Sequence, residues 1–201
     1  MVAPSDIQID ALKEVGNIGA SHASNVLGQM IGKTVIINVP KTDFLPVSEL
    51  SNVFDGEDGP IVLLFFLILG DVEGFMVISF SESQAAQISN YLMGTSHDCL
   101  ELNDDNKSAL KEVGNVISSA YLTAMSNLAG FNLMPSVPYL TYDAVEAVVG
   151  PVIKDIGKTT DYALITDNEF LLDGKSIMGK CITFYNDESF NKILSALCVD
   201  Y

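Results

Sequence analysis

The chain contains one seven-residue segment, ALKEVGN, twice. It occupies residues 11–17 and returns 98 residues later at 109–115. The same displacement maps Pro40 onto Pro138. Recurrence over such a distance indicates two copies of one structural unit. The segment includes a Glu and an Asn three residues apart, which packing alone does not require. We therefore expect the repeat to carry chemistry as well as architecture.

The composition is that of a globular protein with an acidic surface. Of the 201 residues, 48% are hydrophobic and 18% are charged. This length and hydrophobic content are enough for two halves to share one core. The net charge is −16, and all 10 basic residues are Lys. A nucleic-acid-binding surface needs a basic patch, so this function is disfavoured. Because the chain contains no Arg, it also cannot bind a phosphate group through a bidentate guanidinium contact. The charge suits a partner that presents Lys or a bound cation.

Neither a disulfide framework nor a membrane segment is indicated. Cys99, Cys181 and Cys198 include no C-x-x-C pair, and we expect free thiols in a reducing cytoplasm. Residues 1–9 lack the basic and apolar regions of a signal peptide. The apolar run 61–69 is too short to cross a membrane, so we expect a strand covered on both faces and no membrane insertion.

The first copy predicts a helix, a strand, a short helical segment, a hairpin and a second helix. Ser5 and Gln8 fit a capping box, and Gly32 fits a helix end. Pro40 is expected to close the first strand. The predicted elements are a helix over 5–31, a strand over 34–39, one or two helical turns over 46–53, strands over 61–69 and 73–80, and a helix over 81–93.

The second copy repeats this order after a linker over 95–106. Its predicted elements are a helix from Asn103 or Asp104 to Ala129, a strand over 131–137 closed by Pro138, a helix over 142–155 interrupted or kinked at Gly150-Pro151, strands over 162–166 and 177–184, and a helix over 187–197. Residues 169–172 could extend the first of these two strands. We therefore predict an α+β fold with two pseudo-symmetric α-β-α-β-β-α repeats, about 5–94 and 103–198. They form one domain over 1–201, share an antiparallel sheet, and carry the two long helices on the outer face.

Each long helix is predicted to have a polar stripe and a buried face. At 100° per residue, the stripes are Asp10, Glu14, Asn17 and Ser21 in the first copy, and Ser108, Glu112, Asn115 and Ser119 in the second. The opposite face of the first helix comprises Leu12, Val15, Gly16, Gly19, Ala20, Ala23, Val26, Leu27 and Met30, and its small residues permit close packing. A single pair of Glu and Asn three residues apart on a helix usually only faces solvent and has no function. Its recurrence favours a functional pair, because Asn is a poor helix former.

The two stripes resemble the signature of the CheC/CheX/FliY phosphatases of chemotaxis. That signature is Asp or Ser, three residues, Glu, two residues, Asn, twenty-two residues, Pro. It fits Asp10, Glu14, Asn17 and Pro40, and again Ser108, Glu112, Asn115 and Pro138. The resemblance covers nearly the whole chain. With two signatures, the chain is most similar to the two-site CheC members of the family.

The resemblance implies a phosphatase acting on the aspartyl phosphate of a CheY-type response regulator. It implies that Glu14 and Glu112 form salt bridges to a lysine of the regulator, and that Asn17 and Asn115 orient the attacking water. The regulator supplies Mg²⁺, so no metal or nucleophile of this chain is expected. Partner contacts are expected at Asp10, Ser108, Ser21 and Ser119, although Asp10 and Ser108 could equally serve only to keep the stripe polar. Pro40 and Pro138 are expected to be structural.

Other functions are compatible with parts of this pattern. An exposed Glu has a pKa near 4.3, poorly suited to a general base at neutral pH. His22 and His97 have no metal-ligand spacing, which disfavours a metal-dependent hydrolase, and we expect His22 to be packed or half-buried. The main alternative is a non-catalytic module, which would dock like the middle domain of FliM or regulate through the partner CheD.

Overall fold

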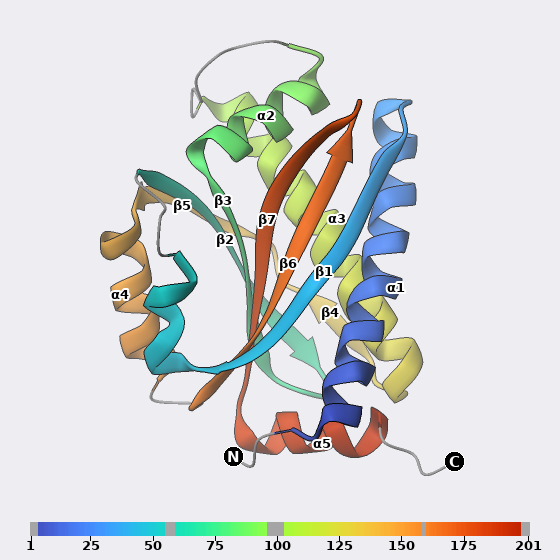
Figure 1. Cartoon of the computed structure of the whole chain (residues 1–201), viewed down its shortest axis with the longest axis vertical. Coiled ribbons are helices and arrows are strands. Elements are labelled where there is room, and N and C mark those ends of the chain that lie inside the picture. Colours follow the sequence, from blue (N-terminus) through green and yellow to red (C-terminus); the bar gives the residue numbers. More distant parts are fainter. Residues whose placement is uncertain (1–3, 55–58, 96–102, 158–159, 198–201) are drawn as a thin grey trace.

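The computed structural model describes residues 4–54, 59–95, 103–157 and 160–197. Two long helices lie side by side on one face of a twisted sheet (Figure 1). The helices are α1 (Asp6–Ile31), η1, a 3-10 helix (Val47–Phe54), α2 (Glu82–Met93), α3 (Asp104–Ala129), α4 (Val145–Ile156) and α5 (Asp187–Leu197). The strands are β1 (Val35–Pro46), β2 (Pro60–Gly70), β3 (Gly74–Ser81), β4 (Leu133–Pro135), β5 (Tyr139–Ala144), β6 (Tyr162–Leu172) and β7 (Lys175–Tyr185).

The two halves exchange strands within one sheet. In the described part of the chain, the antiparallel order is β1-β6-β7-β3-β2-β4, and β5 also pairs with β2. Hairpins β2–β3 and β6–β7 meet at the centre, where β3 pairs with β7. Strand β1 pairs with β6 of the other half, and β4 and β5 pair with β2. The predicted α+β repeat fold is confirmed. Because each half completes the other's sheet, we infer that the chain folds as one domain.

Local sequence sets the ends of the long helices as predicted. The Ser5 hydroxyl caps α1, and its backbone N donates to Gln8 Oε1 at 2.8 Å. Gly32 ends α1 with φ 65°, a left-handed conformation that favours glycine. Asn103 caps α3, which begins at Asp104, so the last residues of the predicted linker are helical. Residues 96–102, with His97 and Cys99, lie outside the described residues, as does Cys198.

The prediction that Pro40 ends a strand is wrong. Strand β1 continues to Pro46, and its register with β6 shifts between Asn38 and Lys41, so that Pro40 lies within a bulge. Pro has no N–H to donate, but β1 is an edge strand and a bulge leaves residues unpaired, so the strand can continue.

The corresponding Pro138 also differs from its prediction. The strand expected over 131–137 is reduced to β4, and Pro138 lies just before β5 rather than closing a strand. In the second copy, residues 136–138 separate β4 from β5 at the position where the bulge shifts the pairing of β1 in the first copy. Pro40 and Pro138 thus lie at the same break in regular strand pairing in the two copies.

Two further predictions for the second copy need correction. Tyr142 belongs to β5, because it pairs with Val62, and the helix begins only at Val145. That helix, α4, runs through Gly150-Pro151 as one element rather than being interrupted there. It occupies the place of η1 in the first copy and has 12 residues against 8. The second copy is therefore four residues longer at this point (12 − 8).

The two faces of the sheet bury separate cores. One core lies beneath α1 and α3 and includes Leu12, Phe66 and Met125. The other lies beneath η1 and α4 and includes Leu50 and Ile61. Strand β2 contributes to both, as predicted, but only over its first part. Leu67 and Leu69 are 47% and 42% exposed, because η1 and α4 do not extend over the end of the strand.

Small residues bring the long helices close to each other and to the sheet. A Cβ atom on Gly114 would lie 3.0 Å from Leu64 Cδ1 and from Phe66 Cζ, whereas one on Gly16 would lie 3.6 Å from the Val39 side chain. Packing against the sheet is therefore tight at Gly114 and looser at Gly16. The predicted buried face of α1 is correct except at Val26 and Met30, which are exposed.

Candidate functional site

The polar stripe of α1 faces away from the core. Asp10, Glu14, Asn17 and Ser21 are all exposed, while Leu12 and Val15 between them are fully buried. Glu14 and Asn17 are three residues apart, which places their side chains as neighbours on one helix face. The helix thereby presents a carboxylate and an amide together.

The stripe of α3 has the same arrangement with one difference. Ser108, Glu112 and Ser119 are exposed, but Asn115 is half-buried. The main-chain oxygen of Asn115 accepts a hydrogen bond from Ser118 Oγ at 3.2 Å. The surroundings of the two amides are therefore not equivalent.

The Glu and Asn side chains are not used within the fold. Glu14, Asn17, Glu112 and Asn115 form no side-chain hydrogen bond or ion pair with any described residue. Asn is unfavourable in the middle of a helix, and here it gains no intramolecular hydrogen bond in return. These side chains can therefore bind groups outside the chain.

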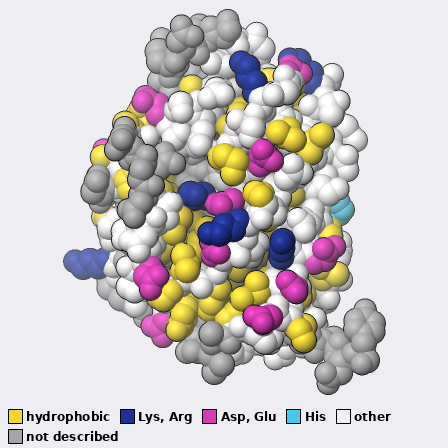
Figure 2. Space-filling view, viewed as in Figure 1, with side chains coloured by type: hydrophobic (Ala, Val, Ile, Leu, Met, Phe, Trp, Pro, Cys, Tyr) yellow, Lys and Arg dark blue, Asp and Glu magenta, His cyan; other side chains and the backbone are white. Residues whose placement is uncertain are grey.

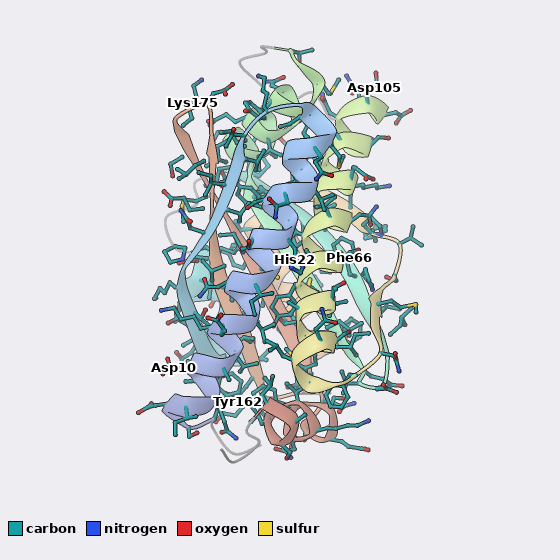
Figure 3. All side chains as sticks on the ribbon, turned by 90° about the vertical axis from the view of Figure 1, so that its right-hand side faces the viewer. Asp10, His22, Phe66, Asp105, Tyr162 and Lys175 are labelled. Atoms are coloured by element: carbon teal, nitrogen blue, oxygen red, sulfur yellow. The ribbon has the colours of Figure 1, made fainter. Side chains whose placement is uncertain are left out.

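The two Glu–Asn pairs lie on either side of the helix crossing. Helices α1 and α3 run in opposite directions, with Asp10 near the lower end of α1 and Asp105 near the upper end of α3 (Figure 3). The helices touch at Gly19 and Tyr121. Each pair comes from the N-terminal half of its helix, so the pairs lie on opposite sides of this contact.

Hydrogen bonds to serine hold α1 against the sheet. Ser24 Oγ donates to the oxygen of Ala20 and accepts a hydrogen bond from the backbone N of Ile37, both at 2.8 Å. The second bond joins α1 to β1 just after the stripe. This bond fixes the position of α1 against β1, and Glu14 and Asn17 lie on the same continuous helix.

Charges on the opposite sheet face are paired with one another. Lys41 lies 2.6 Å from Asp43, and Lys180 lies 3.1 Å from Asp167. Lysine and acidic side chains interleave near the middle of the face shown in Figure 2. The hydrogen bond to Asp43 raises the pKa of Lys41. Glu14 and Glu112 have no such lysine partner among the described residues.

The remaining candidates give no metal or membrane site. His22 is exposed on α1, contrary to the prediction that it is packed or half-buried. Among the described residues, no three His, Cys, Asp or Glu side chains cluster in a way that could hold a metal ion. No helix in the described ranges is long and apolar enough to span a bilayer.

One buried polar cluster was not anticipated from the sequence. Tyr121, Cys181 and Tyr185 lie between α3 and the sheet, and burial raises the pKa of the Cys181 thiol to about 12. Burial also raises the pKa values of Tyr121 and Tyr185. Cys181 and Tyr185 both lie on β7, whereas Tyr121 comes from α3, so only the fold brings Tyr121 to the other two.

Comparison with known proteins identifies the family. The sequence model of the CheC-like family matches residues 7–42 and 106–142, the segments that contain the two stripes. The CheY-P phosphatase CheC of Bacillus subtilis (strain 168) is 32% identical over 195 residues, which cover 94% of this chain and 93% of that protein. The chain belongs to the CheC-like family. The putative CheY-P phosphatase CheC1 of Halobacterium salinarum is 20% identical over 94% of this chain and 96% of its own length.

Solved structures with the same fold include FliY and FliM proteins. Thermotoga maritima FliY matches this CheC-like chain with a TM-score of 0.76 and 19% identity, over 98% of each chain. The FliM middle domain of H. pylori matches with a TM-score of 0.67 and 15% identity, over 96% of this chain and 99% of that one. At these identities the matches establish the fold.

Proposed function

We propose that this CheC-like protein hydrolyses the aspartyl phosphate of a CheY-type response regulator at two sites, Glu14–Asn17 and Glu112–Asn115. One observation carries the proposal. Both pairs lie on the outward stripes of α1 and α3, within the segments that the CheC-like family model matches, and their side chains have no partner among the described residues. The relationship to the CheY-P phosphatase of Bacillus subtilis supports the substrate.

Each Glu is proposed to bind the receiver. Glu14 and Glu112 are exposed, so each can approach the lysine in a receiver's active site as an ionised carboxylate. Contact brings the opposite charges together, where their Coulomb attraction is largest and offsets part of the cost of removing water from both groups. The Glu side chains then hold the neighbouring Asn side chains in register with the phosphoryl group.

Each Asn is proposed to position the attacking water. The amide oxygen of Asn17 or Asn115 accepts a hydrogen bond from a water molecule placed in line with the phosphorus–oxygen bond to the aspartyl group. The water oxygen bonds to phosphorus, the bond to the aspartate carboxylate breaks, and the proton passes to the phosphate product. The Mg²⁺ and lysine of the receiver stabilise the charge. Because an acyl phosphate is labile, positioning supplies enough help.

A decay assay with phosphorylated receiver tests the proposal. The wild-type protein should shorten the receiver's phosphorylated lifetime, and Asn17→Ala and Asn115→Ala should each reduce this effect. The double variant should abolish it. A double variant as fast as wild type would show that the assignment is wrong. If one single variant had no effect, only the other site would be active.

A non-catalytic role is the second candidate. The fold is shared with FliM, which has been solved in a complex with FliG. In that case the chain would bind partners such as CheD through the same scaffold and leave the phosphoregulator lifetime unchanged. The phosphatase is favoured because the Glu and Asn side chains of both pairs have no partner among the described residues and can contact a receiver. Whichever role applies, the free buried Cys181 suits the reducing cytoplasm that we propose as its location.

A further inference from the structure

An uncovered apolar surface lies at the end of the sheet. Leu67 pairs with Phe75, Leu69 pairs with Met134, and Phe65 pairs with Tyr139 across neighbouring strands. Leu67, Leu69, Phe75, Met134 and Tyr139 are exposed, and we call these five residues the apolar patch. Cross-strand partners and alternate residues of a strand share one face, so the patch is contiguous.

The patch lies on the sheet face opposite α1 and α3. Ile61 and Leu63, which have the same parity on β2 as Leu67 and Leu69, belong to the core beneath η1 and α4. The patch continues that core beyond the ends of these two elements. A molecule bound there would therefore leave the stripes of α1 and α3 accessible.

A pocket opens within the patch. It has a volume of about 390 Å³, and Leu67, Leu69, Phe75, Thr160 and Phe184 contribute to its walls. Pockets of this size can take one large side chain or a small ligand. Met134 and Tyr139 extend the exposed apolar area beyond the pocket, which favours a polypeptide over a small molecule.

The charge beside the pocket defines the partner further. Glu73 lines the pocket, and exposed Asp161 follows Thr160. Neither carboxylate has an ion-pair partner among the described residues. The nearby Lys192 is directed elsewhere, because its Nζ donates to the oxygen of Asp71 at 2.7 Å and lies over the Phe131 ring. The rim is thus acidic, which repels a second copy of a chain of net charge −16.

We propose that the apolar patch is a docking surface for a partner polypeptide that inserts a large apolar side chain into the pocket and places Lys or Arg beside Glu73 and Asp161. The surface is independent of the proposed phosphatase chemistry. It permits one partner to bind while a receiver occupies α1 or α3.

Binding of designed peptides tests this surface. The probe is a fluorescent peptide with Leu and Phe anchors flanked by Lys, and the matched control peptide has Ser in place of both anchors. Leu67→Asp and Glu73→Lys should each weaken binding of the anchored peptide about tenfold or more, as expected for a residue that anchors an interface. Ile36→Asp, a similarly exposed strand residue, and Glu49→Lys should not.

Each alternative result contradicts the proposal. Absence of binding by the anchored peptide, equal binding by the Ser peptide, or unchanged binding to both Leu67→Asp and Glu73→Lys would overturn it. Sedimentation showing a dimer that Leu67→Asp disrupts would assign the patch to a second copy instead. Phosphatase activity measured in parallel should be unaltered, so failure of the docking surface is distinguishable from failure of the catalytic assignment.

Discussion

A Cβ atom on Gly19 would lie 2.9 Å from the Cα atom of Tyr121, so α1 and α3 meet backbone to backbone there. We expect Gly19→Ala to destabilise the protein, because overpacking costs about 1–3 kcal/mol and exceeds the gain of about 1 kcal/mol in helix propensity. Gly16→Ala is the matched control, since its Cβ fits at ordinary contact distance. Urea unfolding should show Gly16→Ala neutral or stabilised. Stabilisation of both variants would contradict this packing.

Because Gly114 packs more tightly against the sheet than Gly16, a side chain added at Gly114 should displace the Glu112–Asn115 pair more than one added at Gly16 displaces Glu14–Asn17. In an Asn17→Ala background, Gly114→Ala should lower the receiver dephosphorylation rate about tenfold, because small misplacements of catalytic groups are costly. In an Asn115→Ala background, Gly16→Ala should have little effect on the α1 site. Equal effects of the two glycine substitutions would show that the different contacts beneath α1 and α3 do not matter for activity.

Salt should weaken recognition of the receiver. Glu14 and Glu112 are proposed to bind a receiver lysine, and added salt shortens the reach of surface charges, to about 3 Å at 1 M. We expect KM to rise with ionic strength while kcat changes little. A Glu14→Gln/Glu112→Gln variant should raise KM and lose much of this salt dependence. Glu49→Gln/Glu73→Gln removes the same charge elsewhere and should behave like wild type.

Alkaline pH should destabilise the contact between Tyr142 and Glu82. The Tyr142 hydroxyl donates to Glu82 Oε1, and burial together with this hydrogen bond raises the pKa of Tyr142 to about 12. An unfolded tyrosine ionises near pH 10, so the folded state binds the proton more tightly. This contribution to stability is complete below about pH 10 and is lost as pH rises towards 12.

Tyr142→Phe measures that contribution. It should lower the free energy of unfolding at neutral pH by about 1 kcal/mol, below the usual range of about 1.5–3 kcal/mol for a hydrogen bond to a charged group, because both side chains are only partly buried and solvent screens the contact. It should also reduce the loss of stability between about pH 10 and 12 relative to wild type. Tyr139→Phe, at an exposed hydroxyl, is the control and should change neither. An unchanged alkaline profile for Tyr142→Phe would contradict the assignment.

The helices and hairpins could be predicted because their signals are local. Ser5 with Gln8 and the terminal Gly32 determine the ends of α1 through their own backbone. The prediction at Pro40 failed because the course of this strand depends on distant residues rather than on local sequence. Proline normally ends pairing, but the position of β1 at the sheet edge and its register shift to Lys41 depend on β6, more than a hundred residues later.

The stripes could be predicted, but their surroundings could not. The spacing of Glu14 and Asn17 on a helix is enough to place them on one exposed face. The burial of Asn115 depends on tertiary neighbours and so differs from that of Asn17 despite identical local sequence. Similarly, nothing in the apolar run 61–69 indicates where η1 and α4 end, so the exposure of Leu67 was missed.

The most direct test of the proposed mechanism measures receiver binding and phosphate loss together for Asn17→Ala/Asn115→Ala. Both Glu residues remain, so the variant should still bind phosphorylated receiver with nearly the wild-type affinity. Loss of both water-positioning amides should slow hydrolysis about 10²-fold or more, towards the receiver's unaided rate. Hydrolysis at the wild-type rate by a variant that binds normally would contradict the account.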